Sequence, residues 1–373
     1  MTTVDEVRVG AVGAGGFGLF ALQHLTQLPG VRLTAMARTD REPARRMAER
    51  FGIPDVVDIE ALVRSDDVDL VYISTPPFLH YADALAALRA GKHVICEKPL
   101  ALSVEHADEL IDVAKANERL LVVNLMQRYN PLSEQVRELI ASRILGELLH
   151  GTFENYASDE GLPLDHWFWD RNKSGGIFVE HGVHFFDLFD YWLGPGTVEA
   201  AQRTLRAQSG VEEQVQCTVR HPTGALVNHY HGFTQAARMD RQETRLLFEQ
   251  GDVRLHGWIP TQLHIDAIVD ESAARRLTEL FPGARYDVTA YYQGNERKVT
   301  ARHRTFDVYE RLSFHWGEET LKSHRYGELL RSFFADQIAW VRDPSHPRTT
   351  TEKNGRQSLV MALHAARLAD SPN

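Results

Sequence analysis

Three side chains have the chemistry to exchange a proton with a substrate oxygen and to stabilise charge on it. Lys98 follows the short apolar run His93–Cys96, and an ammonium there could hydrogen-bond an oxygen that gains negative charge. Glu180 and His184 stand four residues apart in a helical pattern, so they share one helix face, and Asp187 lies on the same stripe. Because imidazole titrates near neutral pH, His184 suits proton exchange with a hydroxyl or carbonyl oxygen. Glu180 could orient that imidazole or bind a neighbouring hydroxyl.

A simpler structural explanation is open for each of these residues. A lysine after a strand is most often a solvated charge, and a histidine in an apolar helix is most often a hydrogen-bonded core residue. Glu180, His181, His184 and Asp187 also gather histidines and carboxylates, and Asn228-His229-Tyr230-His231 places two histidines on one strand face. Neither group has the HExxH or cysteine–histidine spacing of a zinc site, so we expect no metal.

A glycine-rich turn near the start of the chain has the pattern of a dinucleotide-binding loop. Gly13-Ala14-Gly15-Gly16-Phe17-Gly18 fits GxGxxG, follows the apolar run Val7–Val12 and opens a helical pattern. In such a loop the first glycine allows a tight turn, the second lets the backbone approach a pyrophosphate, and the third packs helix against strand. The helix N-terminus then faces the phosphate charge. We expect Gly13, Gly15, Gly16, Phe17 and Gly18 to bind the cofactor.

The residues after the second predicted strand, Leu33–Ala37, favour one of the two nicotinamide cofactors. An acid at this place binds the 2′-hydroxyl of NAD, whereas an arginine accommodates the 2′-phosphate of NADP. Arg38 occupies the place of the acid, and Thr39 adds a hydroxyl donor. Asp40 could still reach a ribose, and Arg38 could be a solvated surface residue, so NAD(H) remains possible. We predict that NADP(H) is preferred.

The order of apolar runs and helical patterns predicts an α/β Rossmann domain, a doubly wound parallel sheet, over residues 1–127. Short runs rich in Val, Ile and Leu alternate there with helical stretches, as in βαβ units. The predicted strands are Val7–Val12, Leu33–Ala37, Leu70–Ser74, His93–Cys96 and Leu120–Val123. From residue 128 to 373 strands are gathered together, which predicts a C-terminal α+β domain with a mostly antiparallel open sheet. Its last helix, Asn354–Leu368, could pack back on the first domain.

Length and composition exclude several classes of protein. A chain of 373 residues exceeds the size at which one hydrophobic core keeps growing. The net charge of −10 argues against a nucleic-acid partner, which needs a basic face. Cys96 and Cys217 cannot form a disulfide framework, which fits a reducing compartment. Because the sequence has neither a secretory signal nor an apolar run of ~20 residues, we expect a cytoplasmic protein with no membrane partner.

Taken together, the motifs resemble those of the glucose–fructose oxidoreductase/inositol dehydrogenase (Gfo/Idh/MocA) family. The resemblance spans nearly the whole chain and rests on the GxGxxG loop, Ser74-Thr75-Pro76-Pro77-Phe78-Leu79-His80, Glu97-Lys98-Pro99 and the run Gly175–Asp187. It implies that Lys98 is catalytic and that a second-domain helix carries a carboxylate and a histidine over the nicotinamide, here Glu180 and His184. The family typically has aspartate at the first of these positions, so Glu180 keeps the carboxylate but reaches one methylene further.

The resemblance also implies further contacts. It places Thr75, Pro76, His80 and Glu97 with Lys98 at the cofactor, and it implies pairing through the open sheet face into a homodimer or homotetramer. The aromatic segment before Gly175 suits stacking on a sugar ring, although such clusters are as often core anchors. Our candidates for substrate binding are Arg128, Trp169 and Arg171, together with Lys98, Glu180 and His184.

The leading hypothesis is an NAD(P)-dependent oxidoreductase that transfers a hydride between a nicotinamide cofactor and a sugar, polyol or related hydroxy or keto compound. One alternative is an NAD-dependent, glycosidase-type redox-neutral hydrolase, because some members of the family oxidise a sugar only transiently. Glycoside cleavage without cofactor turnover would identify it. The other alternative is a non-catalytic regulator that senses the cofactor, but such a binder needs neither Lys98 nor His184.

Overall fold

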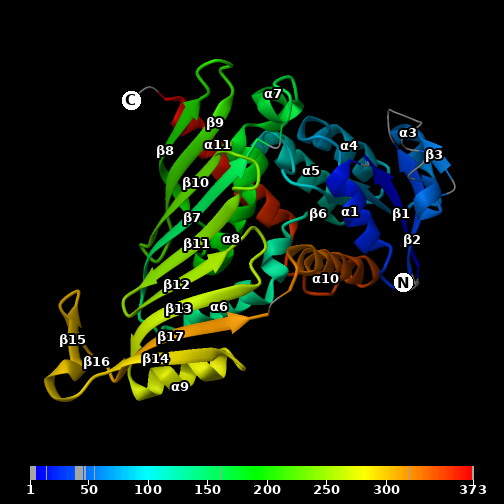
Figure 1. Cartoon of the computed structure of the whole chain (residues 1–373). Helices are drawn as coiled ribbons and strands as arrows, with labels where there is room; N and C mark the ends of the chain where they lie inside the picture. Colours follow the sequence, from blue (N-terminus) through cyan, green and yellow to red (C-terminus); the bar gives the residue numbers. More distant parts are fainter. Residues whose placement is uncertain are drawn as a thin grey trace. The chain divides into compact units, whose positions relative to one another are not determined.

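The chain divides into two compact units that are interleaved along the sequence (Figure 1). The computed structural model describes residues 6–13, 15–37, 45, 48–53, 55–159, 161–318 and 320–371. The first unit comprises Met1–Tyr129, Pro163–Asp187 and Tyr326–Ala366, and the second comprises Asn130–Leu162, Leu188–Arg325 and Arg367–Asn373. The predicted division after residue 127 is simpler than this arrangement, in which two later segments return to the first unit.

A six-stranded parallel sheet in the order β3-β2-β1-β4-β5-β6 forms the core of the first unit. This is a doubly wound order that reverses beside β1, as the sequence predicts. The side chains of its central strands are buried on both faces because helices cover each side. The strands are β1 (Val7–Val12), β2 (Val31–Ala37), β3 (Asp55–Val57), β4 (Leu70–Ile73), β5 (His93–Cys96) and β6 (Leu121–Val123). Among the described strands of this sheet, β3 alone was not predicted, because its three residues include only two apolar ones, Val56 and Val57.

The helices of the first unit begin where the sequence supplies a start signal. Pro77 opens α4, where its missing N–H leaves no hydrogen bond unmade, and the Ser103 hydroxyl caps α5 by accepting from the His106 N–H. Helix α11 packs against β6, since a Cβ on Gly355 would lie 2.5 Å from Val123 Cγ2. The helices are α1 (Gly16–Leu25), α3 (Ile59–Arg64), α4 (Pro77–Arg89), α5 (Val104–Ala116), α10 (Lys322–Arg342) and α11 (Glu352–Asp370).

A nine-stranded sheet in the order β14-β17-β13-β12-β11-β7-β10-β9-β8 forms the second unit. Its neighbouring strands are antiparallel except for β7 and β10, which agrees with the predicted α+β class. The strands are β7 (Leu148–Ser158), β8 (Thr197–Leu205), β9 (Glu212–Arg220), β10 (Leu226–Gln235), β11 (Arg241–Phe248), β12 (Gly251–His256), β13 (Gln262–Val269), β14 (Arg285–Tyr291) and β17 (Glu310–Gly317). A separate hairpin joins β15 (Lys298–Ala301) to β16 (Arg304–Asp307).

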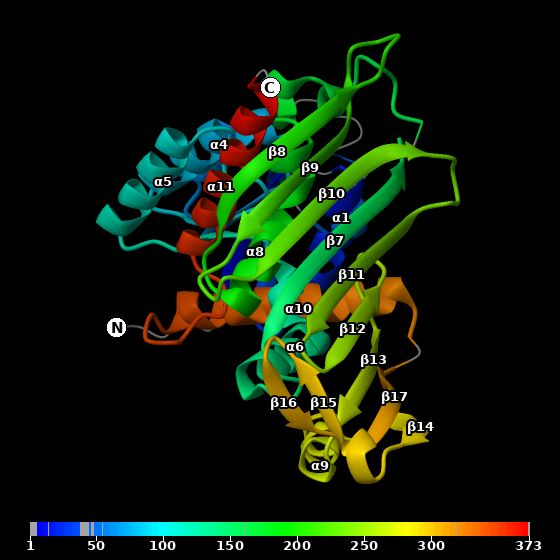
Figure 2. The same ribbon diagram turned by 90° about the vertical axis from the view of Figure 1, so that its left-hand side faces the viewer.

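Helices of the second unit pack on one face of this sheet. They are α6 (Pro131–Ser142), α9 (Glu271–Leu280) and the end of α8 (Val183–Leu193). The ring of Phe189 in α8 lies 5.1 Å from that of His229 in β10, and a guanidinium N–H of Arg276 in α9 donates to the Ser142 carbonyl in α6. The opposite face of strands β7–β12 is turned toward the viewer in Figure 2.

Among the described residues, no helix is both long enough and apolar enough to cross a bilayer.

Candidate active site

Lys98 and Glu180 form an ion pair within the first unit. The Lys98 ammonium donates to the Glu180 carbonyl oxygen at 2.6 Å and also to its carboxylate. The two side chains are only 19% and 13% exposed. An ammonium has three donors, and in the described part of the chain Glu180 accepts two hydrogen bonds from Lys98. The third N–H of the ammonium can reach a substrate oxygen.

A π-helical turn, Phe178–Gly182, presents Glu180 to Lys98. It follows the left-handed Gly175 and Gly176 and runs directly into α8. Single π turns occur often at functional sites because they disturb the regular hydrogen bonding of the helix. Here the Glu180 carbonyl bonds the lysine. The sequence predicts the helix over Ile177–Leu193, but its hydrophobic pattern gave no sign of the π turn.

Two buried histidines lie within the electrostatic reach of Lys98. Burial lowers the pKa of His184 well below its usual value, and the Lys98 charge lowers it further. The pKa of His181 is also well below its usual value, because of burial, Lys98 and His184. Both rings are therefore neutral near pH 7, and a neutral imidazole can accept a proton. The sequence singled out His181 only as part of a possible metal cluster, although this residue lies within the run Gly175–Asp187 on which the family resemblance rests.

Arg128 forms a two-pronged ion pair with Asp187. Its Nε and Nη2 donate to the two carboxylate oxygens, each at 2.8 Å. Burial raises the pKa of Asp187, and the Arg128 charge opposes that effect. The pair joins the 3₁₀ turn Met126–Tyr129 to the first turn of α8. The Arg128 guanidinium therefore already binds a carboxylate of the protein. Substrate binding by Arg128 stays a prediction.

Glu97 is held beneath the turn that carries Lys98. Its carboxylate accepts from the Tyr72 hydroxyl at 2.7 Å and from the Asn124 amide at 2.9 Å, and burial raises its pKa. Tyr72 is in β4 and Asn124 directly follows β6. Neither has a motif of its own, so sequence reasoning missed them. A contact between Glu97 and the cofactor stays a prediction.

His80 lies between the ends of two neighbouring strands. Its Nδ1 lies 2.7 Å from the Pro99 carbonyl oxygen, and its Nε2 lies 2.7 Å from that of Thr75. The side-chain hydroxyl of Thr75 donates to Asp83 at 2.9 Å. These contacts hold together the predicted cofactor-binding segments Thr75–Pro76 and Glu97–Lys98. They leave direct cofactor binding by His80 a prediction.

The glycine loop has the shape that a bound pyrophosphate needs. A Cβ on Gly13 would lie 2.8 Å from the Thr75 nitrogen, and one on Gly18 would lie 2.2 Å from the Ser74 hydroxyl oxygen. A Cβ on Gly15 or Gly16 would meet nothing within 4 Å. Two of the glycines therefore pack against the protein, and the other two face open space beside the N-terminus of α1, where phosphate binding is favoured. The residues present fit a dinucleotide.

The positions of the other predicted site residues do not show what these residues bind. Phe17, at the first turn of α1, is 36% exposed. Trp169 is buried, with its ring 4.7 Å from that of Phe168, and its contact with a substrate stays a prediction. Arg171 opens the short helix α7 (Arg171–Ser174). Arg38 and Thr39, together with Asp40, lie outside the described residues.

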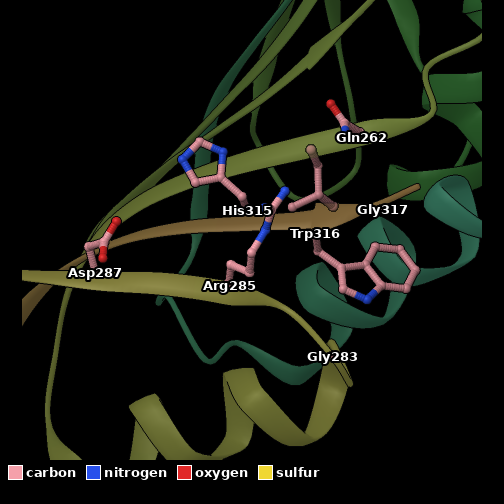
Figure 3. A pocket seen from close by; sticks show the side chains of 8 residues that line it. Gln262, Gly283, Arg285, Asp287, His315, Trp316 and Gly317 are labelled. Carbon is pink, nitrogen blue, oxygen red and sulfur yellow. The ribbon is translucent and has the colours of Figure 1, made fainter. Parts of the chain in front are cut away.

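No group of three or more histidines, cysteines and carboxylates that could hold a metal ion is found among the described residues. A pocket of about 380 Å³ lies in the second unit, at the edge strands β14 and β17 (Figure 3). Its walls contain none of the predicted site residues and are formed by Gln262, Leu263, Gly283, Arg285, Asp287, His315, Trp316 and Gly317.

Comparison with known proteins identifies the family of this chain. Residues 7–125 match an oxidoreductase family model with an NAD-binding Rossmann fold, and residues 133–254 match the GFO/IDH/MocA C-terminal domain. The chain is 35% identical over 296 residues to an inositol 2-dehydrogenase of Rubrobacter xylanophilus, covering 70% of this chain and 85% of that protein. The chain therefore belongs to the Gfo/Idh/MocA family.

Two further comparisons concern a partial sequence match and the fold. The chain is 32% identical to an uncharacterised oxidoreductase of Streptococcus pneumoniae, and the match spans about half (52%) of each protein. The structure of levoglucosan dehydrogenase with NADH and L-sorbose has a TM-score of 0.76 at 18% identity and covers 98% of this chain and 97% of that one. At that identity the likeness concerns the fold alone.

Proposed function

We propose that this protein is an NAD(P)-dependent oxidoreductase that interconverts a hydroxyl and a carbonyl group on a sugar, polyol or related compound. The observation that carries the proposal is the arrangement around Lys98. An ammonium fixed by Glu180 lies close enough to the buried imidazole of His184 to lower its pKa. The same unit contains a glycine loop that is open to a dinucleotide. The inositol and levoglucosan enzymes named above act on compounds of this class.

The charge of each residue determines its role in the proposed reaction. When bound, the nicotinamide supplies or accepts the hydride. The Lys98 ammonium, held in place by the Glu180 carboxylate, hydrogen-bonds the reacting oxygen and stabilises negative charge on it. Neutral His184 accepts the hydroxyl proton during oxidation and returns it during reduction. Because the Glu180 carboxylate is paired with Lys98, its role is to position the ammonium.

A panel of sugars, polyols and their keto forms, assayed at the nicotinamide absorbance with both cofactors, tests this function. Lys98→Ala should abolish turnover and leave cofactor affinity nearly unchanged, because the ammonium acts on the reacting oxygen. Unchanged turnover in Lys98→Ala would disprove the role of Lys98. Glycoside cleavage without net cofactor reduction would replace the proposal with the redox-neutral hydrolase.

The same proposal includes a preference for NADP(H) over NAD(H). Arg38 follows β2 at the place where an acid would bind the ribose 2′-hydroxyl. A guanidinium can bind a phosphate through two parallel hydrogen bonds. Arg38→Ala should therefore weaken NADP binding by ~1.5–3 kcal/mol, the range for hydrogen bonds to charged groups, and barely change NAD binding. Tighter binding of NAD than NADP by the wild type would contradict this choice.

We also propose that the chain forms a homodimer or homotetramer through the sheet face turned away from α6 and α8. Across that face runs a row of basic side chains in consecutive cross-strand pairs: Arg285, His315, His264, Arg254 and Arg245. A parallel row two residues along the strands contains Asp287, Asp266 and Asp252. Ion pairs within the chain join these two rows, as between Arg245 and Asp252 and between Arg254 and Asp266. The face is therefore balanced in charge, so a second copy related by a two-fold axis would meet no excess of like charge on it.

A further inference from the structure

We propose that His80 is a positioning residue that fixes the Lys98 ammonium by tying the Lys98–Pro99 turn to the end of β4. The proposal deepens the function given above and rests on Lys98 being the group that binds the reacting oxygen. His80 is in the first turn of α4, and its side chain is 1% exposed. It therefore acts through its contacts within the protein.

The two ring nitrogens of His80 meet two backbone carbonyls from different segments. Nδ1 lies 2.7 Å from the carbonyl oxygen of Pro99, which directly follows Lys98. Nε2 lies 2.7 Å from the carbonyl oxygen of Thr75, just after β4. Strands β4 and β5 are paired in the sheet, with Ile73 opposite Cys96, so the ring spans the gap between the two turns where these strands end.

The chemistry of imidazole suits this place. A neutral ring has one N–H and donates to one of the two carbonyls, and a protonated ring donates to both. Burial lowers the pKa of His80, as does the Lys98 charge, whereas the two carbonyls and the Glu180 charge raise it. An apolar side chain of the same size would fill the space but could not bond either carbonyl.

His80 completes a set of contacts that hold Lys98 from three directions. On the N-terminal side, Glu97 accepts from Tyr72 and Asn124. On the C-terminal side, the Pro99 carbonyl meets His80, and Glu180 holds the ammonium itself. Removing the His80 tether frees the C-terminal side of the turn, so the ammonium should lose its fixed position while the glycine loop stays unchanged.

The first test needs no enzyme activity. Lys98 is reductively methylated with formaldehyde and a borane, and its modification is quantified by mass spectrometry against exposed Lys115 of the same molecule. In His80→Phe, Lys98 should react about tenfold faster than in the wild type, the factor expected for the loss of one hydrogen bond. The control is His93→Phe, because His93 is at the other end of β5 and accepts a hydrogen bond from the Leu120 N–H. That variant should label Lys98 at the wild-type rate.

The second test is kinetic. His80→Phe should lower kcat by about 10²-fold, as a small misplacement of a catalytic group can, and this factor should exceed any change in the cofactor dissociation constant. His80→Gln, whose amide keeps a donor, should recover part of both effects and serves if His80→Phe does not fold. Equal Lys98 labelling in the His80 variants and His93→Phe would overturn the proposal. If no substrate of the wild type is found, the proposed function fails, and the labelling experiment still decides the role of His80.

Discussion

The protonation states of a few buried groups decide what this site can do. His184 and His181 are neutral because burial and the nearby ammonium both disfavour their charged forms. Lys98 is held in place because Glu180 accepts hydrogen bonds from it through both a carboxylate and a carbonyl. A fixed cation beside a neutral base is the combination that hydroxyl oxidation requires.

His184→Ala should lower turnover by ~10²–10⁴-fold, the usual cost of losing a general acid–base group. Because the pKa of His184 is depressed, it remains an unprotonated base as the pH falls through 6.5. The acid limb of kcat/KM for oxidation should therefore lie below pH 6.5. Stopped-flow or steady-state rates measured across the pH range give the position of this acid limb.

Glu180→Gln should shift the same profile and lower kcat, because the Lys98 ammonium loses the carboxylate that holds it in place. Glu180→Asp is the control, since it keeps the carboxylate with one methylene less. A profile that is identical in the wild type and in the His184 and Glu180 variants would show that this helix has only a structural role.

At the scale of elements, the site depends on short segments being brought together at strand ends. The glycine loop joins β1 to α1, the Lys98 turn follows β5, and the π turn leads into α8. All three belong to the first unit, because Pro163–Asp187 returns to it. Two substitutions test the difference between glycines that pack against protein and glycines that face open space.

Gly15→Ala should leave the stability of the cofactor-free protein unchanged or slightly raised, because its Cβ enters open space. It should nevertheless weaken NAD(P)(H) binding by about tenfold or more, since the pyrophosphate needs that space. Gly18→Ala should instead destabilise the free protein by ~1–3 kcal/mol, because its Cβ collides with Ser74. Thermal unfolding and cofactor titration distinguish the two variants. Equal stability and equal cofactor affinity in both would refute the division into packed and open glycines.

Arg128→Gln should destabilise the protein by ~3–5 kcal/mol near pH 7, because it leaves the Asp187 carboxylate buried without its partner. The raised pKa of Asp187 gives the sign of the pH dependence: protonation removes the unpaired charge, so the deficit should shrink as the pH falls toward 5. The double variant with Asp187→Asn should recover part of the stability at pH 7. A pH-independent deficit in denaturant unfolding would argue against this explanation.

At the scale of the whole molecule, the open sheet face is the feature that suggests assembly. Its strands alternate between side chains that pack under α8 and side chains that form the rows of opposite charge described above. In β7, for example, Gly151 and Phe153 are buried and Thr152 between them points to the other face. A large charge at that position should disturb a partner and leave the core intact.

The wild type should have the mass of a dimer or tetramer by light scattering at micromolar concentration. Thr152→Arg should shift it toward the monomer, because a long charged side chain beside Arg245 would stand on the face that the two copies share, where buried charges are unfavourable. Thr278→Arg on the exposed side of α9 is the matched control and should leave the mass unchanged. A monomeric wild type, or equal masses in all three proteins, would refute the proposed interface.

The sequence by itself determined the features that depend on local patterns. Buried strands such as Val7–Val12 and His93–Cys96 have apolar runs that only a parallel sheet accommodates, so their bounds were predictable to the residue. The glycine loop and the Glu97-Lys98-Pro99 turn were readable because their functions require fixed residue types at fixed spacing. The nine-stranded sheet was predicted only as a class. Strands such as β13 and β17 alternate buried and less buried residues, but the order in which the strands pair is not written in that alternation.

Only the tertiary structure decided which groups meet. No spacing in the sequence places Glu180 on Lys98, because the contact joins residues 82 positions apart and depends on a π turn. The depressed pKa values of His184 and His181 likewise result from burial, which is a property of the packed unit. The sequence identified His80 as a candidate, but only the structure shows its ring between two carbonyls. Local periodicity records the environment of each segment, whereas contacts between segments are fixed by how they pack.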